Sequence, residues 1–429
     1  MSMQEERKPR VIVAHPSKQH SFYTATAFER EGMLDAYITT IYDREGSITH
    51  GLKRLLKGKD LKKASTRSCP DIPDEKVIQF YELDYLVSLF LNRIPKLRRI
   101  REKHRRYVAN KFGKKVAKYA IEHQVDAVIM YDSTAETCFD TLKNTCPKII
   151  RILDCSISSR PFMKNNFERD MSLYQHNELM KEHPDFWIAK DLKSSIREIK
   201  ESGAYFVPSK IVKESIAFCG GDTSKAEIVP YGVDVQKFSC KENINTGKKL
   251  RLIYVGQVTY RKGIHHLLNV VSRFASDEIE LDLVGSYDSK SDLYLKYCNS
   301  DNIHFCGFIT RDVLASKYKM ADMFVFPTLG EGYGLVVLES LACGVPVLCS
   351  NLAGGDDAIQ EGVNGYVFNP FDEDELFEKL QFCIDKIEVI RQMSSTARKT
   401  ALNYTWENYY KNIIMAFERI WTNGGDSNL

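Results

Sequence analysis

The sequence lacks the features that define several protein classes. It has no C-x-x-C pair and no histidines at metal-ligand spacing, and its eleven cysteines are an odd number. We therefore expect neither a disulfide framework nor a zinc site, and we interpret the cysteines as reduced core residues of a cytosolic protein. No apolar run approaches the length of a membrane span; the nearest, residues 85–91, is far too short. The charged N-terminal residues contain no apolar core of a signal peptide.

Length and overall composition are ordinary. The 429 residues are too many for one compact core, so two domains are expected. A hydrophobic content of 43% and a charged content of 27% are typical of a soluble globular protein.

The net charge is only +3, but the positive charges are concentrated in two runs. Residues 91–120 hold twelve Lys or Arg against the single acid Glu102, and residues 52–67 hold seven against Asp60. Aliphatic side chains lie between the basic ones, which favours an anionic membrane surface as partner. A solvated helix surface or a polyanion would account for the same charges, and we expect no nucleic acid. The predicted location is cytoplasmic, peripheral at the inner face of the membrane.

The most informative stretch is residues 327–343. The apolar run Met323–Phe326 predicts a short buried strand, the glycines that follow predict a turn, and a helix is expected from about Leu335 to Cys343. Such a turn directs unpaired backbone N–H groups and a helix dipole toward an anion. Glu331 and Glu339 bracket it, roughly 12 Å apart if the segment were helical. This spacing suits two sets of sugar hydroxyls beside a diphosphate; a helix cap with an ordinary surface glutamate is the alternative.

The segment Glu331-Gly332-Tyr333-Gly334-Leu335, with Glu339 following, resembles the E-x7-E signature of the retaining glycosyltransferases of family 4, of the bacterial polysaccharide and glycoconjugate type. The similarity extends over residues 252–368 and includes these flanks: Phe326-Pro327, Gly344-Val345-Pro346-Val347, Gly354-Gly355 and Asn364-Gly365. The resemblance implies an α/β protein of the GT-B fold. Two Rossmann-like doubly wound domains would face each other across a cleft, and a C-terminal helix would cross back to the first domain.

The second half of the chain alternates between strand and helix patterns from residue 252 to residue 348, which predicts a doubly wound parallel sheet. Its first turn after a strand, residues 256–263, resembles the family's G-R-x(n)-K-G motif, with Lys262-Gly263 as the Lys-Gly. Gln257 stands where the family usually has arginine. Either Arg261 supplies that charge or the site binds diphosphate with a weaker positive field. A surface loop with a solvated Arg-Lys pair is the alternative.

By this resemblance, Lys262, Arg261 and Glu331 are the predicted catalytic residues. Glu331 would orient the transferred sugar, and Glu339 the ribose. The remaining donor-binding residues implied by the resemblance are Gly256, Gln257, Gly285, Phe308, Gly332, Tyr333, Gly334 and Leu335. The acidic residues 372–374 are interpreted as the first turn of a helix, and no metal or other cofactor is expected.

The first half opens with a strand–helix–strand pattern. A strand is expected at residues 10–14, a helix at 22–31 with Ser21 or a neighbour as its N-cap, and a strand at 36–42. Residues 43–80 are interpreted as an irregular insertion, residues 97–123 as a long basic helix, and residues 167–182 as a helix.

Polar residues follow three of the predicted strands, at the sheet edge where open α/β sheets bind ligands. The family often has a histidine that contacts the transferred sugar near two of these strand ends, where this chain has aspartates. The candidate residues on the acceptor and phosphate side are His15, Lys18, His20, Asp132 and Asp154, and both histidines have a structural alternative.

The expected division places the acceptor-side domain at residues 1–236, a linker at 237–248 and the nucleotide-sugar domain at 249–403. A helix at about 404–422 would pack on the first domain. The resemblance implies transfer of a sugar, without a metal, from a nucleotide-diphosphate sugar to a glycan or lipid-linked acceptor, with retention of configuration. A nucleotide-sugar epimerase with the same fold is one alternative. A non-catalytic protein that binds polyanions or membranes is the other.

Overall fold

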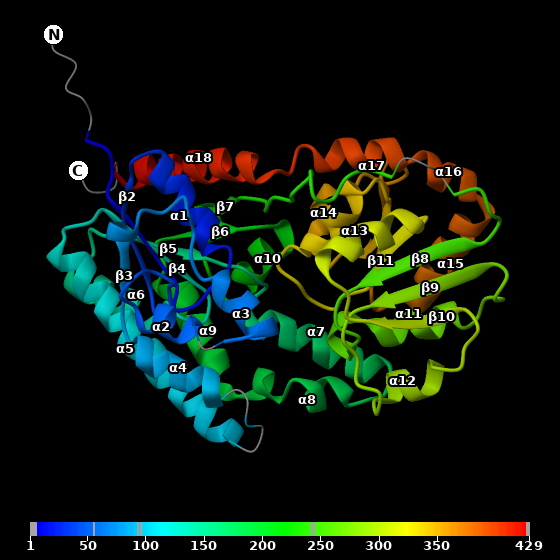
Figure 1. Cartoon of the computed structure of the whole chain (residues 1–429), viewed down its shortest axis with the longest axis horizontal. Coiled ribbons are helices and arrows are strands. Elements are labelled where there is room, and N and C mark those ends of the chain that lie inside the picture. The colour runs from blue at the N-terminus through cyan, green and yellow to red at the C-terminus, as the bar shows by residue number, and fades with distance from the viewer. Residues whose placement is uncertain (1–6, 55, 92–93, 95–96, 242–244, 426–429) are drawn as a thin grey trace, which may run out of the picture.

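Two parallel sheets, each covered by helices, make up the computed structural model, which describes residues 7–54, 56–91, 94, 97–241 and 245–425 (Figure 1). The first sheet has the order β3-β2-β1-β4-β5-β6-β7. Its strands are β1 (Val11–Ala14), β2 (Leu34–Thr39), β3 (Val77–Gln79), β4 (Ala127–Tyr131), β5 (Ile150–Asp154), β6 (Ala204–Val207) and β7 (Ala226–Ile228).

The second sheet has the order β10-β9-β8-β11-β12-β13, and all of its strand pairs are parallel. Its strands are β8 (Leu250–Val255), β9 (Ile279–Val284), β10 (Ile303–Gly307), β11 (Met323–Phe326), β12 (Val347–Ser350) and β13 (Gly365–Phe368). In both sheets the chain runs outward from a central strand in one direction and then in the other, which is the doubly wound pattern. The expected fold class is confirmed.

Helices connect the strands throughout. The first half contains α1 (Ser21–Arg30), α2 (Ile48–Lys53), α3 (Gly58–Ser65), α4 (Glu82–Leu91), α5 (Arg98–Glu122), α6 (Glu136–Thr145), α7 (Arg160–Leu173), α8 (Glu178–Glu182), α9 (Ala189–Glu201) and α10 (Lys210–Phe218). The second half contains α11 (Ile264–Val271), α12 (Asp292–Tyr297), α13 (Arg311–Met320), α14 (Leu335–Ala342), α15 (Glu373–Asp385), α16 (Ile387–Gln392), α17 (Ser394–Ala401) and α18 (Trp406–Gly425).

The core of the first sheet has two sides because side chains alternate along each strand. Val11 and Val13 of β1 belong to the hydrophobic cluster that also contains residues of α1 and α18. Ile12 and Ala14 belong to a second cluster, with residues of α5, α6, α9 and α10. The first cluster continues into the core of the second sheet, so the two halves share one hydrophobic core.

The C-terminal helix α18 lies along α1 of the first half (Figure 1). The ring of Trp406 stacks on that of Tyr23, with centroids 3.5 Å apart, and the hydroxyl oxygen of Tyr409 lies 2.9 Å from Oγ1 of Thr24. The expected return of a C-terminal helix to the first domain is therefore observed.

Two local expectations differ from the structure. The helix expected at residues 167–182 is two helices, because Gln175 has a left-handed φ of 54° and ends α7 before α8 begins. The segment 43–80 is more regular than expected, since it forms α2, α3 and the edge strand β3, which pairs with β2. The cap of α1, expected at Ser21 or a neighbour, is the neighbour His20, and Ser21 is the first residue of the helix.

Parts of some predicted segments lie outside the described residues. These are residues 1–6 of the first domain, residue 55 of the basic run 52–67, residues 92–93 and 95–96 of the run 91–120, and residues 242–244 of the linker.

Candidate active site

Two loops at the carboxyl ends of β8 and β11 bring three charged side chains together. Arg261 and Lys262 lie in the short turn η5 (Tyr260–Lys262) after β8, and Glu331 lies in the turn after β11. Nη1 of Arg261 is 3.0 Å from Oε1 of Glu331, and Nζ of Lys262 contacts the same oxygen. All three side chains are mostly buried. The predicted catalytic residues are thus placed side by side, at the sheet edge where such folds bind ligands.

The glycine after Lys262 explains why the first loop can approach so closely. Gly263 has a φ of 66°, and a Cβ atom on it would lie 1.8 Å from the carbonyl oxygen of Pro327. Any larger residue would push the loop away from β11 and its following turn. With glycine there, the Lys262 ammonium lies over the ring of Phe326 as well, 5.1 Å from its centroid.

The electrostatics of this group favour an ionised carboxylate. Burial opposes ionisation of Glu331, but Lys262 and Arg261 outweigh it and lower the pKa of that carboxyl. Burial also lowers the pKa of Lys262, an effect that Glu331 counteracts. The two cations and the anion therefore stabilise one another in their charged forms.

The turn that carries Glu331 is docked on the first domain. The Ser158 hydroxyl donates to the carbonyl oxygen of Glu331 at 2.9 Å, and the Ser209 hydroxyl donates to that of Gly332 at 2.7 Å. A Cβ on Gly332 would lie 1.9 Å from the carbonyl oxygen of Ser156, so the two backbones meet closely there. Sequence reasoning did not find Ser158 or Ser209, because neither lies in a recognisable motif.

Backbone N–H groups of this turn remain available to a ligand. Within the described part of the chain, the N–H groups of Gly332, Tyr333 and Gly334 have no hydrogen-bond acceptor. Gly334 precedes the first residue of α14, Leu335, so these groups lie at the positive end of a helix. The Tyr333 side chain is buried against Tyr231 of the first domain. Only the backbone N–H of Tyr333 can therefore contact a ligand in this site.

Glu339 lies on α14 and is 8% exposed. Burial raises its pKa to about 7, although the nearby Arg311 guanidinium opposes the rise. Arg311, at the start of α13, is a further residue that sequence reasoning missed.

The other predicted donor residues differ in exposure. Phe308 is 76% exposed, and Leu335 is 38% exposed. Gly256 and Gly285 follow the neighbouring strands β8 and β9 and touch each other, since a Cβ on Gly285 would lie 1.7 Å from the carbonyl oxygen of Gly256. The carbonyl oxygen of Gln257 accepts a hydrogen bond from Tyr254 at 2.7 Å.

On the first domain, a histidine does reach one of the aspartates at the strand ends. Nε2 of His20 lies 2.9 Å from Oδ2 of Asp154 and 3.3 Å from the hydroxyl oxygen of Tyr231. His20 comes from the turn after β1, whereas Asp154 ends β5. The fold thus builds a His–Asp pair from two candidates that are 134 residues apart.

The remaining acceptor-side candidates have separate environments. His15 is buried, its Nδ1 lies 2.9 Å from the backbone nitrogen of Ser17, and burial lowers its pKa to about 4. Asp132 accepts a hydrogen bond from the backbone of Ser156 at 2.8 Å, and burial raises its pKa. Burial also lowers the pKa of Lys18. A structural role fits the contacts of His15 and Asp132.

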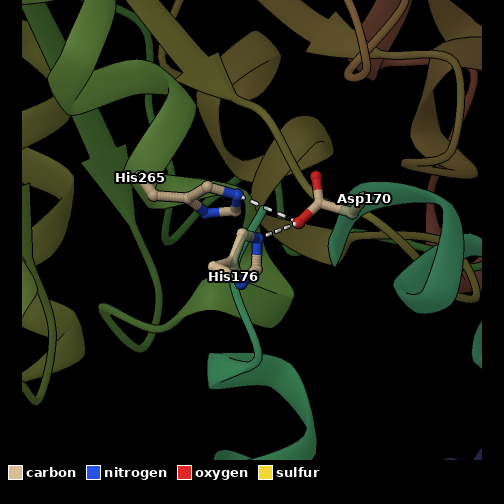
Figure 2. A group of neighbouring side chains, drawn as sticks. All are labelled: Asp170, His176 and His265. Carbon is tan, nitrogen blue, oxygen red and sulfur yellow. Dashed lines mark hydrogen bonds and ion pairs between the residues drawn. The ribbon is translucent and has the colours of Figure 1, made fainter. Parts of the chain in front are cut away.

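A second charged cluster, which the sequence did not reveal, joins the domains away from Glu331. Asp170 of α7 is fully buried, and its carboxylate faces three histidines. Its Oδ2 is 2.8 Å from Nε2 of His176 and 3.1 Å from Nε2 of His265 (Figure 2). Its Oδ1 is 2.7 Å from Nε2 of His266, whose Nδ1 lies 2.8 Å from Oε1 of Glu373. The only local signal was the adjacent pair His265-His266.

The ligand atoms of Asp170, His176 and His265 lie within 4.8 Å of one another, close enough for one metal ion. The hydrogen bonds nevertheless satisfy the carboxylate without an ion. The backbone N–H of Glu178 donates to Nδ1 of His176 at 3.3 Å, which assigns the ring proton to Nε2. A metal on Nε2 would displace that proton, so we interpret the cluster as a hydrogen-bond network between domains.

The predicted acidic helix start is confirmed. Asp372 caps α15, and its side chain accepts hydrogen bonds from the backbone N–H groups of Asp374 and Glu375. This explains residues 372–374 without a metal.

Comparison with known proteins places the second half in a defined class. Residues 235–400 match the family described as Glycosyl transferases group 1. The chain is similar to the sulfoquinovosyl transferase SQD2 of Arabidopsis thaliana, with 28% identity over 51% of this chain and 45% of the relative. It is also similar to the D-inositol 3-phosphate glycosyltransferase of Geodermatophilus obscurus, with 25% identity over 46% of this chain and 48% of the relative. The chain thus spans about half the length of these curated relatives.

Solved structures resemble the whole chain. Sucrose-phosphate synthase from Thermosynechococcus elongatus aligns with a TM-score of 0.63 at 17% identity, covering 97% of this chain and 100% of that one. Alr3699/HepE of Anabaena, solved in complex with UDP, aligns with a TM-score of 0.59 at 13% identity, covering 96% and 100%. These likenesses show the fold, which is of the GT-B type, and residues 235–400 match the glycosyl transferases group 1 family.

Proposed function

We propose that this protein is a retaining glycosyltransferase, which moves a sugar from a nucleotide-diphosphate sugar to a glycan or lipid-linked acceptor without a metal ion. The observation that carries the proposal is the contact of Lys262 and Arg261 with the Glu331 carboxylate. Two cations and one anion converge there beside the free N–H groups of the turn at residues 332–334. Such an arrangement suits a diphosphate and a sugar bound next to each other.

The contacts of Glu331 suggest how the donor is bound. The Glu331 carboxylate offsets part of the positive charge of Lys262 and Arg261. An arriving diphosphate offers both cations a stronger anionic partner, and the carboxylate is then free to accept hydrogen bonds from sugar hydroxyls.

In the transfer step, the acceptor oxygen forms a bond to the anomeric carbon while the bond from that carbon to the diphosphate oxygen breaks. The departing diphosphate takes the acceptor's proton on the same face, so configuration is retained; this route is the one implied by the family resemblance. Lys262, Arg261 and the N–H groups of Tyr333 and Gly334 stabilise the negative charge that develops on the leaving group. They would serve where other folds use a metal.

The nucleotide to test first is uridine diphosphate, since HepE was solved with UDP and also with UDP-glucose. Glu339 is the proposed partner of the ribose hydroxyls. Glu339 lies on α14, eight positions after Glu331. The turn and the helix that follows it could therefore bind the sugar through Glu331 and the ribose through Glu339.

We also propose that the first domain docks on an anionic membrane surface. Leu83, Val87 and Phe90 are exposed on one side of α4, at helical spacing, and α4 packs against the basic helix α5. An apolar row beside Lys and Arg side chains suits the headgroup boundary of a bilayer. Among the described helices, none is both long enough and apolar enough to cross a membrane.

The proposed activity is tested with a panel of UDP-, GDP- and ADP-sugars, scored by released nucleotide with and without candidate acceptors. Lys262→Ala is expected to lower turnover by about 10²–10³-fold, as is typical when a preorganised charge-stabilising donor is removed. Lys118→Gln, an exposed change on α5, is the control and should leave donor turnover unchanged. Full turnover by Lys262→Ala, or no nucleotide preference for any wild-type reaction or binding, would eliminate the proposal.

A further inference from the structure

A cationic cavity opens at the carboxyl edge of the first sheet. It is separate from the turn that carries Glu331 and residues 332–334, which is called the donor turn below. Its volume is about 200 Å³. Four elements line it, namely α5, the turn and first residues of α6, the start of α7, and α9. The charged residues among its lining are Arg105, Arg106, Glu136, Arg160, Lys190, Asp191 and Glu198.

The topology explains the positive character of this cavity. In a parallel sheet with crossover helices, each helix begins at the edge where strands end, so helix N-termini gather there. The cavity is lined by the first residues of α6 and α7, by residues of α9 from its first turn onward, and by residues 105–110 in the middle of α5, which contribute Arg105 and Arg106. Ser133, at its rim, has a left-handed φ of 68°, an unusual conformation for a serine that tightens the turn between β4 and α6.

Two guanidinium groups in the lining have unused hydrogen-bond donors. Nη1 of Arg160 and Nε of Arg106 are buried, and neither has a partner in the described part of the chain. The Lys190 side chain is exposed, and no carboxylate lies within ion-pair distance of it or of Arg160 among the described residues. Buried guanidinium N–H groups without partners are costly, and an anion would satisfy them.

The acids of the lining are engaged elsewhere. Asp191 pairs with Nη2 of Arg106 at 2.9 Å, and Glu136 accepts a hydrogen bond from the Ser194 hydroxyl. The Glu198 carboxylate accepts from the backbone N–H groups of Ser133 at 2.8 Å and Ala135 at 2.7 Å, so it caps α6. Among the residues that the structure describes, no ion pair joins any of these acids to Arg160 or Lys190.

The cavity is close to the donor turn in the chain. Ser158 donates to the carbonyl oxygen of Glu331, and Arg160 follows it by two residues, at most about 7 Å of backbone. One short segment therefore touches the donor site with Ser158 and lines the cavity with Arg160. A group bound in the cavity would lie on the first-domain side of the transferred sugar.

We infer that this cavity binds a phosphate group of the acceptor substrate, held by Arg160, Arg106 and Lys190. The inference rests on the proposed function and narrows its acceptor to a phosphorylated one. The inference also assigns different roles to the basic residues of α5. Arg105 and Arg106 line the cavity, so they do not belong only to a flat membrane-facing surface. A phosphate monoester and a diphosphate share the required chemistry, because guanidinium groups bind either through paired N–H donors.

In the test, wild-type protein is first saturated with the nucleoside diphosphate that it binds. Glycerol 3-phosphate is then titrated into this complex. A second arm uses phosphatidylcholine vesicles that contain phosphatidic acid, which presents the same phosphate monoester on a lipid. Arg160→Gln is expected to weaken the affinity for at least one probe by about tenfold, as the loss of a charge-assisted hydrogen bond predicts. Arg106→Gln should act in the same direction.

Lys386→Gln is the matched control, since it removes one exposed positive charge from the second domain, outside both the cavity and the basic helix α5. The inference is supported if Arg160→Gln weakens a probe's binding and Lys386→Gln does not, and the responding arm shows whether the phosphate is soluble or lipid-linked. Equal binding by wild type and Arg160→Gln in both arms, with nucleoside diphosphate still bound, overturns the inference and leaves the proposed function standing. If no nucleoside diphosphate binds, the proposed function fails whatever the phosphate probes show.

Discussion

Oδ1 of Asp170 lies 2.7 Å from Nε2 of His266, so a carboxylate of the first domain holds the first turn of α11 in the second. Both groups are almost completely buried. Burial opposes protonation of His266, but the hydrogen bonds with Asp170 and Glu373 outweigh it and raise the pKa of that imidazole. The contact is therefore a charged one, made where the segment α7–α8 reaches the second domain.

Replacing Asp170 with Asn should destabilise the protein. The change leaves the buried His266 imidazolium with one fewer anionic partner, and breaking a buried ion pair costs about 3–5 kcal/mol. Urea unfolding should show this loss, and small-angle scattering should show whether the domains separate. Asp277→Asn, an exposed change, is the control. Equal stability of Asp170→Asn and wild type would show that the network contributes nothing to holding the domains.

The open question at Gln257 can be settled with a pair of substitutions. Because Arg261 shares the Glu331 oxygen with Lys262, we expect it to supply the charge that the family places at position 257. Arg261→Gln should lower turnover by about 10²-fold or more. Adding Gln257→Arg to that variant should restore part of the loss. Unchanged turnover in Arg261→Gln would assign the diphosphate to Lys262 and the backbone N–H groups alone.

Nucleotide affinity should depend on pH through Glu339. Burial raises the pKa of its carboxyl to about 7, so it is mostly protonated at pH 6 and mostly ionised at pH 8. Only the ionised form accepts hydrogen bonds from both ribose hydroxyls, and affinity should therefore rise about tenfold between these values. Calorimetric titration of wild type and Glu339→Gln separates this effect from ionisation of the ligand itself, which both proteins share.

The raised pKa of Glu339 also affects the stability of the folded protein, but stability changes with pH in the opposite direction to nucleotide affinity. A carboxyl with a raised folded-state pKa stabilises the folded protein below its ordinary value of 4.5, and this contribution is lost as the pH rises toward 7. Weaker nucleotide binding at pH 6 can therefore not be attributed to unfolding caused by Glu339. Identical pH profiles for wild type and Glu339→Gln would exclude the proposed ribose contact.

The pair of His20 and Asp154 should matter for transfer and not for donor binding. His20→Gln removes a hydrogen bond to a carboxylate on the acceptor side, and we expect transfer to fall by about tenfold or more. The affinity for the nucleoside diphosphate should stay within about twofold of wild type. Steady-state transfer and fluorescence titration give the two readings. A matching loss of nucleotide affinity would instead indicate a general structural role.

Membrane docking is tested by Phe90→Glu, which places a charge in the exposed apolar row of α4. Burying a phenylalanine side chain contributes about 1.5–3 kcal/mol, so affinity for vesicles with anionic lipid should fall about tenfold or more. Sedimentation with vesicles at two salt concentrations gives the measurement. Phe382→Glu, an exposed aromatic on α15 of the second domain, is the control. Equal losses for both variants would contradict a specific docking face.

Much of the fold could be predicted from local patterns. The strand Met323–Phe326 has the bounds that its apolar run predicted, because four apolar residues between Asp322 and Pro327 allow few alternatives. The neighbourhood of Lys262 and Glu331 was also predictable, since both follow strands whose carboxyl ends lie at one edge of the sheet. The interruption between α7 and α8 at residues 174–177 could not be predicted, because contacts with the second domain stabilise it. The Tyr174 hydroxyl donates to the carbonyl oxygen of Phe371 at 3.0 Å.

By itself the sequence determined the two parallel sheets, the glycine-rich turn with Glu331 and the cations beside it. These depend on residue spacing and turn chemistry within a few positions. Only the tertiary structure decided that His20 meets Asp154 and that Asp170 meets His266. It also decided that Ser158 contacts the turn at Glu331 while Arg160, two residues later, lines a cavity. Such pairs join residues far apart in the chain, and their distances depend on how the two domains pack, which no local pattern records.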